Sequence, residues 1–374
     1  MNRKLIIGEL DGAPSVCVLE DGEAVEILTG SQLFGNVYLG RVISLQPGLD
    51  AAFIDIGLGK NAILSGKDVA VEKPKVGDEL IVQIAKNPGG DKGAVVRRDI
   101  RLAGRFCVLM PMNGTVGVSR RVEDEGESER LRRLAQKVRI PGMGIILRTN
   151  AADAAEEEIV SDIAALREAW TAMEQKAQHI KAPALLRDEG SILYRAARDI
   201  FCKDLKEVEI SSKKLYNIFS GYVDTFSPAL RDRVKLNETG DLFTVYRLRA
   251  QLEDARKRKI NLPCGGSIVI DRTEAMTVID VNSGKYTGSH DARKTILRVN
   301  LEAAKEIAKQ LRLRDIGGII IVDFIDMAEK EDRTTLLDAM RQHLLSDRSR
   351  ARAIDITALG LMEITRMKKD ESGT

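Results

Sequence analysis

Acidic and amide side chains at the ends of two apolar segments are the residues of this sequence best suited to chemistry. Asp280 ends the apolar segment TVID, Asn282 follows two residues later, and Asp323 lies within a second apolar segment, GIIIVDFIDM. Such groups are costly to bury unless a cation or a hydrogen-bond partner meets them. Two carboxylates and one carboxamide, with no His or Cys nearby, offer oxygen ligands only. These suit Mg²⁺ or Mn²⁺ rather than zinc.

A magnesium ion held by these residues would favour a phosphodiester substrate. Mg²⁺ usually takes one or two protein carboxylates and completes its shell with water and phosphate oxygens. It would activate water and neutralise the charge that develops on the phosphoryl oxygens. A purely structural role is the alternative to a metal site, because a lone Asp at a strand end is more often a cap or a turn residue. Asp271 and Asp326 are further acids nearby, and spacing alone does not rank them below the other two.

A strand, a helix and a second strand are needed to bring Asp280 and Asp323 together. Residues 267–281 are predicted to form a hairpin. The segment 294–314 has apolar residues at helical spacing, and 318–327 reads as a buried strand because it is almost continuously apolar. This order favours a right-handed crossover and a parallel pair of strands. Functional groups gather at the carboxyl ends of such strands, so the two carboxylates are expected to converge.

The part of the chain before this site predicts a different architecture. The Asp-Gly pairs at residues 11–12 and 21–22 predict tight hairpins. Five short strands between residues 36 and 100 predict a small barrel of the OB type. Helices are predicted for the charged segment 123–138, on the surface, and for 153–182.

The composition predicts a soluble globular protein of several domains. The 374 residues exceed one typical domain, and 44% are hydrophobic and 30% charged. The formal net charge of +2 is nearly balanced, so any contact with nucleic acid must come from a local basic surface. The four cysteines lie far apart, which argues against a disulfide scaffold or a Cys-rich zinc site. No membrane-spanning run or signal peptide is found, and a cytoplasmic location is expected.

Two long stretches around the acidic residues resemble the catalytic core of the ribonuclease E/G family. They are GGSIVIDRTEAMTVIDVNSGK and NLEAAKEIAKQLRLRDIGGIIIVDFIDM. Earlier in the chain, FGNVYLGRV and LDAAFIDIG resemble the family's S1 domain, and GRFCVLMP, SRRV and GMGIILRT resemble its sensor for RNA 5′ ends. GLMEITR is similar to the end of its nuclease domain. The resemblance covers essentially the whole chain.

The resemblance implies a multidomain fold of the α+β and α/β classes. An S1 (OB-type) β-barrel and a 5′-sensor are expected as insertions in an RNase H-like subdomain, followed by a DNase I-like α/β nuclease domain. The expected boundaries are 1–31 and 192–255 for the RNase H-like subdomain, 32–98 for the S1 RNA-binding domain, 99–191 for the 5′-sensor region and 256–374 for the DNase I-like catalytic domain. The RNase H-like part is expected to be structural, because it shows no matching acidic set.

The implied activity is that of a Mg²⁺-dependent endoribonuclease, with Mn²⁺ as an alternative ion. It would cleave single-stranded RNA, leave a 5′-phosphate and a 3′-hydroxyl, and be stimulated by a 5′-monophosphate end. Asp280 and Asp323 would hold the metal, and Asn282, the third catalytic residue, would help to orient the scissile phosphate. The implied cellular role is RNA processing and decay, including rRNA maturation and mRNA turnover.

Two residues of the S1-like segment match positions that contact RNA in the family. Phe53 would stack on a base, and Lys92 would meet a phosphate. From its position alone, Phe53 would rather be taken as a core aromatic. Ile63 stands where the family has a second exposed aromatic residue, so a weaker hold on RNA is expected from this face.

Five residues of the sensor-like segment match positions that recognise the 5′ end. Arg148 and Thr149 match the pair that binds a 5′-monophosphate, where a guanidinium and a hydroxyl supply strong donors. Gly104 and Val108 match positions that touch the terminal nucleotide, and Arg120 is a weaker candidate. Taken without the resemblance, an Arg-Thr pair after an apolar strand is more often a solvated strand end.

The expected partner is single-stranded RNA with a 5′-monophosphate, and a homodimer is expected. The sequence ends in MKKDESGT without the CPxCxGxG-type zinc link by which family members join two chains. No zinc is therefore expected in this chain, and the missing link argues against a zinc-linked dimer. The sequence leaves two other functions open: a non-catalytic RNA-binding module, and a nuclease or other phosphodiesterase directed at DNA.

Overall fold

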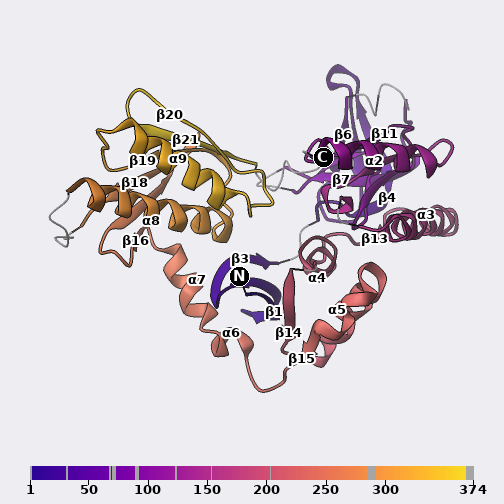
Figure 1. Ribbon diagram of the computed structural model, residues 1–374. Coiled ribbons are helices and arrows are strands. Elements are labelled where there is room, and N and C mark those ends of the chain that lie inside the picture. Colours follow the sequence, from indigo (N-terminus) through magenta and orange to yellow (C-terminus); the bar gives the residue numbers. More distant parts are fainter. Residues whose placement is uncertain are drawn as a thin grey trace. The chain divides into compact units, whose positions relative to one another are not determined.

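The structure is a computed structural model. It describes residues 2–30, 33–66, 69, 73–88, 92–122, 124–152, 154–202, 204–284 and 292–367 (Figure 1). The chain forms two compact units. Unit 1 comprises residues 1–29, 204–215 and 235–374, and unit 2 comprises residues 30–203 and 216–234.

The first sheet contains the start of the chain and a later segment that returns to it. Its order is β15 (Val234–Leu236), β14 (Leu205–Ile210), β1 (Arg3–Leu10), β2 (Ala13–Glu20) and β3 (Glu23–Thr29). Asp11 and Asp21 have φ values of 53° and 50°, and the glycine after each is also at positive φ. Positive φ at both central residues is the geometry of tight hairpin turns, so the two hairpins predicted from Asp-Gly pairs are confirmed. β1 and β14 pair in parallel.

The second sheet of unit 1 carries the predicted acidic site. Its order is β16 (Lys259–Asn261), β17 (Ser267–Arg272), β18 (Met276–Asn282), β19 (Gly318–Asp323), β21 (Leu361–Arg366) and β20 (Arg352–Ile356). Helix α8 (Ala292–Leu313) connects β18 to β19, and α9 (Lys330–Leu344) connects β19 to β20. The helices α6 (Leu242–Val245) and α7 (Leu248–Arg256) precede the sheet. The predicted hairpin, helix and parallel pair of strands are confirmed. Their bounds shift by at most two residues, except that β19 ends at Asp323, four residues before the predicted end.

One face of this sheet is buried under α8 and α9 (Figure 1). Along β18, buried and exposed side chains alternate strictly, with Ile279 buried and its two neighbours facing the other way. Ile279 and Ile320 share one core with Ile307 of α8 and Leu336 of α9. Burying each such side chain contributes roughly 1.5–3 kcal/mol. The prediction that β19 is buried on both faces is wrong: Ile319 is 51% exposed, because the helices cover only one side of the strand.

Five strands of unit 2 close into a small barrel, as predicted from their spacing. They are β4 (Val37–Gln46), β5 (Ala51–Asp55), β6 (Ala62–Ser65), β8 (Val95–Arg97) and β7 (Glu79–Lys86), and β4 pairs with both β5 and β7. A short helical turn, η1 (Pro47–Leu49), links the first two strands, and β13 (Ala184–Arg187) adds to β4. Gly40 allows the close approach of β5, because a Cβ there would lie 2.5 Å from Cγ2 of Ile54.

A second, four-stranded sheet of unit 2 holds the predicted sensor segment. Its order is β11 (Val116–Val118), β12 (Gly144–Leu147), β10 (Cys107–Met110) and β9 (Leu102–Ala103). Helices within the described residues of this unit include α2 (Glu125–Lys137), η2 (Thr149–Ala151), α3 (Glu156–His179), α4 (Ile192–Arg195) with the π-helical turn Ala196–Ile200, most of α5 (Lys213–Phe226), and η4 (Pro228–Arg233).

Two helices of unit 2 differ from their predictions. α2 is not a wholly exposed surface helix, because Leu131 and Leu134 pack into the same core as the sensor sheet. α3 ends at His179, three residues before the predicted end, and its first predicted residue, Asp153, lies outside the described residues. Throughout the described parts of both units, no helix combines the length and the apolarity needed to cross a membrane.

Candidate active site and RNA-binding residues

Asp280 and Asp323 are direct neighbours in the second sheet of unit 1. The parallel register of β18 and β19 pairs the two residues. Adjacent strands lie about 4.8 Å apart, and residues paired in register point to the same face. Both aspartates are exposed and lie on the face of the sheet that the helices leave open. The convergence expected from the strand–helix–strand order is therefore present.

Asn282 lies on the same face as the two carboxylates. It follows Asp280 by two residues, which is the repeat of a β-strand. Its Nδ2 donates a hydrogen bond of 2.6 Å to Oδ2 of Asp280. This bond uses the amide NH₂ group, so the amide oxygen can still face a metal ion or a hydrated phosphate.

A buried asparagine holds the chain immediately after Asp323. Asn300 lies on the core side of α8 and is fully buried. Its Nδ2 donates to the carbonyl oxygen of Ile325 at 2.8 Å, and its Oδ1 accepts from the Ile325 N–H at 3.1 Å. Because both backbone groups of Ile325 are satisfied by one side chain, the segment that leaves the acidic site has a fixed path. The sequence feature that could have identified Asn300 is its place, as a single Asn, at an otherwise apolar position of the helical repeat.

The turn after Asn282 depends on glycines. Gly284 has a φ of 63°, and a Cβ there would lie 2.2 Å from the carbonyl oxygen of Gly265. The two backbones can approach only because Gly284 has no side chain. The next residues, 285–291, which belong to the Gly/Ser/Thr-rich segment after the acidic strand, lie outside the described residues.

The two other acids of the region have different surroundings. Both carboxylate oxygens of Asp271 accept hydrogen bonds of 2.6 Å from Arg258, which lowers the pKa of Asp271 below its usual value. Asp271 pairs with Val278 rather than with Asp280. Asp326 is exposed and follows the end of β19. Asp271 is thus already occupied by an arginine, which makes it the poorer metal ligand.

The donor set fits a magnesium ion. No cluster of three or more His, Cys, Asp or Glu side chains suited to a metal occurs among the described residues. Asp280 and Asp323 instead form a pair of carboxylates with an amide beside them. Mg²⁺ is usually bound by one or two carboxylates together with water and phosphate oxygens, so this sparse set suits it.

Phe53 and Ile63 lie side by side on the outside of the barrel. They are paired in register on β5 and β6, and the residues flanking each of them are buried. Phe53 is half-buried, which disfavours the reading of this residue as a core aromatic. Lys92 is exposed, and the chain after it runs beside β6, where the Ile63 N–H donates to Ala94 at 2.8 Å. The preceding residues of the lysine loop, 89–91, lie outside the described residues.

Arg148 and Gly104 are brought together in the sensor sheet. The backbone N–H of Arg148 donates to Phe106 at 2.7 Å, and its Nη1 donates to the carbonyl oxygen of Gly104 at 2.6 Å. Its Nη2 lies 2.9 Å from Oδ1 of Asp199. Val108, on β10, is half-buried and pairs with residues of β9 and β12. The guanidinium of Arg148 is therefore held in place rather than solvated at a strand end.

Polar residues follow both parallel strands β11 and β12 at the same edge of the sheet. The carboxyl ends of parallel strands lie together. Thr149 follows β12 and is exposed, and its Oγ1 lies 3.5 Å from Oγ of Ser119, which follows β11. Arg120 is the next residue and is exposed. The sequence alone predicted no role for Ser119, although it is the first residue of the SRRV segment that resembles the sensor.

Asp162 of α3 explains why residue 104 is a glycine. Its carboxylate accepts backbone hydrogen bonds from Arg105 at 3.2 Å, from Phe106 at 2.8 Å and from Cys107 at 3.2 Å. A Cβ on Gly104 would lie 2.4 Å from Oδ2 of Asp162. Burial, followed by the nearby Asp162 carboxylate, raises the pKa of the Cys107 thiol well above its usual value. Nothing in the sequence marked Asp162, which sits among other acids on a helix.

We expect Gly104→Ala to destabilise the protein, because the new methyl group collides with the Asp162 carboxylate. Overpacking of this kind costs about 1–3 kcal/mol. Gly114→Ala is the matched control, since a Cβ there meets nothing within 4 Å. Chemical denaturation measures both effects. Adding Asp162→Ala should make the two changes non-additive, and a Gly104→Ala protein as stable as the control would contradict the packing described here.

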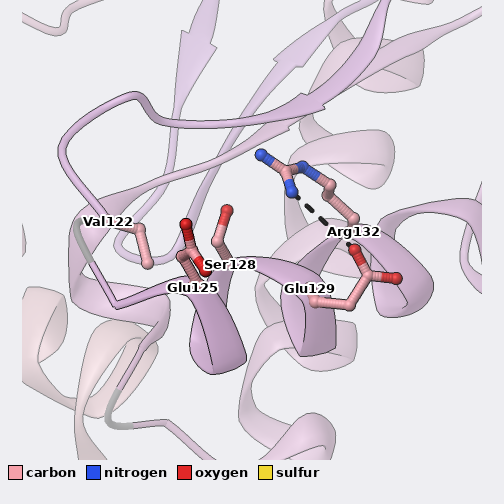
Figure 2. Close-up of a pocket in the computed structure, with 5 residues that line it drawn as sticks. All are labelled: Val122, Glu125, Ser128, Glu129 and Arg132. Carbon is pink, nitrogen blue, oxygen red and sulfur yellow. Dashed lines mark ion pairs between the residues drawn. The ribbon is translucent and has the colours of Figure 1, made fainter.

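A pocket lies against α2 and contains none of the predicted site residues. It is lined by Val122, Glu125, Ser128, Glu129 and Arg132 (Figure 2). The ion pair in Figure 2 joins Nη1 of Arg132 to Oε2 of Glu129 at 3.7 Å, and both side chains are exposed. Exposed pairs of this kind contribute about 0–1 kcal/mol.

Comparison with known proteins identifies related chains. The model of the Ribonuclease E/G family matches residues 101–369. The chain is 36% identical over 388 residues to a ribonuclease E of Nostoc sp. (strain PCC 7120), and the match covers 100% of this chain and 56% of that protein. It is 34% identical over 397 residues to ribonuclease G of Escherichia coli (strain K12), with 100% of this chain and 81% of that protein covered.

The length of the match differs between the two kinds of relative. Ribonuclease E of Haemophilus influenzae is 37% identical over 357 residues, which cover 90% of this chain and 38% of that protein. The chain thus spans only about half the length of the ribonuclease E proteins it matches, or less. Identity at this level over nearly the whole chain, together with the family match, shows that this protein belongs to the ribonuclease E/G family.

Proposed function

We propose that this protein is an endoribonuclease that uses Mg²⁺ to cleave single-stranded RNA. The observation that carries the proposal is the pairing of Asp280 with Asp323 in register, with Asn282 on the same open face. Relatives named ribonuclease E and ribonuclease G support it. Mn²⁺ would be an alternative ion, because it takes the same oxygen ligands.

The three polar side chains have separate tasks in the proposed reaction. Asp280 and Asp323 would hold the ion, and the hydrogen bond from Asn282 fixes the orientation of the Asp280 carboxylate. When bound, Mg²⁺ supplies positive charge that activates water and neutralises charge developing on the phosphoryl oxygens. Water adds to phosphorus, the P–O3′ bond breaks, and O3′ leaves with a proton. The products therefore carry a 5′-phosphate and a 3′-hydroxyl.

The barrel of unit 2 would supply sequence-tolerant affinity for RNA. Phe53 offers a ring on the outer face of β5, where a base can stack, and base–aromatic stacking contributes about 1–3 kcal/mol per base. Its neighbour Ile63 offers contact area without stacking. Lys92 is exposed beside the same strands and would meet the phosphate backbone.

The edge of the sensor sheet would bind a 5′-monophosphate. Arg148 supplies a held guanidinium, and Thr149 and Ser119 supply hydroxyls that approach each other from two strand ends. Arg120 stands next to them as a further cation, and Gly104 and Val108 would contact the terminal nucleotide. A bound 5′ end raises the effective concentration of the rest of the RNA at the cleavage site. A 5′-triphosphate is bulkier and more highly charged, which would disfavour it.

The cellular setting follows from this activity. We propose that the protein acts in RNA processing and decay, including rRNA maturation and mRNA turnover, in the cytoplasm and as a homodimer. A DNase I-like fold for the acidic sheet and an RNase H-like fold for the first sheet also belong to this proposal.

A cleavage assay on 5′-monophosphorylated single-stranded RNA tests the proposal. We expect internal cleavage with Mg²⁺, none with EDTA, and full recovery when Mg²⁺ is restored. The reason is that two carboxylates cannot neutralise the negative charge that develops on the phosphoryl oxygens without a bound cation. A DNA strand of the same sequence and an RNA with a 5′-hydroxyl serve as controls. Binding of the RNA without cleavage would point instead to an RNA-binding module. Equal cleavage of DNA would point to a general phosphodiesterase.

A further inference from the structure

We propose that Asp199 is a positioning residue that holds the guanidinium of Arg148 ready for a 5′-phosphate. The inference rests on the proposed function of the sensor segment and adds to it a residue outside the predicted region 99–191, 51 positions after Arg148. Asp199 belongs to the π-helical turn Ala196–Ile200, and it lies 2.9 Å from Nη2 of Arg148. π-helical turns occur often at functional sites.

Arg148 is fixed at two of its nitrogen atoms. Nη1 donates to Gly104, and Nη2 pairs with Asp199. A guanidinium has five N–H donors in a rigid plane, so two fixed contacts determine the direction of the others. The side chain is 29% exposed, which leaves part of it accessible to a ligand. Such a plane suits the bidentate recognition of a phosphate.

Asp199 is itself anchored, so it can act as a rigid support. Arg198 donates from Nε to Oδ1 of Asp199 at 3.0 Å and from Nη2 to Oδ2 at 2.8 Å. Arg198 also donates to Glu189 at 3.1 Å, and Glu189 in turn accepts from Arg187 at 2.8 Å. Burial works against the charge of Arg198, but Asp199 and Glu189 outweigh it and raise its pKa above the usual value.

The charges of this network leave room for an anion. Three arginines, Arg148, Arg187 and Arg198, meet two carboxylates, Asp199 and Glu189. Within these four ion pairs, the arginines outnumber the carboxylates by one. Because Arg198 already neutralises much of the Asp199 carboxylate, Asp199 orients Arg148 without repelling an incoming phosphate strongly. Without Asp199, a long arginine side chain would have to be ordered at the moment of binding, which costs affinity.

The test compares cleavage of one RNA sequence with a 5′-monophosphate and with a 5′-hydroxyl. The hydroxyl RNA makes no phosphate contact, so it reports on folding and catalysis alone. We expect Asp199→Ala to lower the preference for the monophosphate about two- to tenfold, the cost of ordering one side chain, mainly through KM. Asp199→Asn, which keeps an oxygen acceptor and the shape, should give a smaller loss.

Two comparisons separate positioning from a purely structural role. Asp224→Ala removes another aspartate of unit 2 that pairs with an arginine, Arg231, and should leave the preference unchanged. In an Arg148→Ala background, Asp199→Ala should have no further effect on the preference. An equal loss with both RNAs would make Asp199 structural and overturn the inference. An unchanged preference for the monophosphate RNA in Asp199→Ala would overturn the positioning role of Asp199 and leave the sensor proposal standing. A wild-type protein that shows no preference for the monophosphate RNA would overturn both.

Discussion

Asp280→Asn should abolish RNA cleavage while RNA binding stays nearly intact. The substitution keeps the shape of the side chain and its place beside Asp323, but it removes one of the two negative charges that would hold the ion. Charge stabilisation by a bound metal contributes several kcal/mol to catalysis, which corresponds to a loss of roughly a thousandfold in rate. Cleavage rates of single-stranded RNA at saturating Mg²⁺ measure the loss, and a filter or fluorescence assay measures binding.

The companion variants make this prediction specific. Asp323→Asn should cause a similar loss, and the double variant should be little worse than either one, because the two carboxylates act as a unit. Asp326→Asn, a change in an exposed acid just beyond β19, should retain most of the activity. Cleavage that survives in Asp280→Asn, or that is lost equally in Asp326→Asn, would show that the site lies elsewhere.

Arg148→Ala should reduce the preference for 5′-monophosphorylated over 5′-hydroxyl RNA about ten- to a hundredfold. Hydrogen bonds to charged groups contribute about 1.5–3 kcal/mol, and each 1.4 kcal/mol is a factor of ten. Cleavage of the 5′-hydroxyl RNA should change little, because Arg148 is not part of the acidic site. The ratio of kcat/KM for the two RNAs is the quantity to measure.

Arg132→Ala is a suitable control for the loss of a positive charge from unit 2. Arg132 is exposed on α2 and pairs only weakly with Glu129. Its removal should leave the ratio unchanged. If the ratio fell as much in Arg132→Ala as in Arg148→Ala, the sensor would be a general electrostatic effect rather than a defined contact.

Local patterns predicted the elements of the fold well. The Asp-Gly pairs placed both early hairpins because positive φ at two consecutive residues is easily reached by Asp and Gly. The helical repeat placed α8 to within two residues, and the apolar runs on either side of it gave a parallel pair of strands. From there, topology predicted that Asp280 and Asp323 converge, and the register that pairs them came from the structure.

Burial was less predictable than the elements. The nearly continuous apolar run of β19 suggested a strand covered on both sides, but composition does not say how many faces of a sheet are covered by helices. The many charged residues of α2 likewise suggested a surface helix, but Leu131 and Leu134 pack into the core from a helix that is polar elsewhere. Both errors arose because burial depends on neighbours that are distant in sequence.

The residues that support the sites could not be found from the sequence. Asp162 and Asp199 are single acids on helical segments rich in charge, and the sensor residues that they contact lie 51 to 57 positions away. Only the folded chain shows that one carboxylate holds the Gly104 loop and that the other holds Arg148. Asn300 gave a weak signal, as a polar residue on an apolar helix face.

Binding of Mn²⁺ to the protein, followed by electron paramagnetic resonance, tests the central claim most directly. Mn²⁺ takes the same oxygen ligands as Mg²⁺ and can be counted when free. The account predicts a bound ion in the wild-type protein that is lost in Asp280→Asn and in Asp323→Asn but kept in Asp326→Asn. Wild-type binding in both of the first two variants would contradict it.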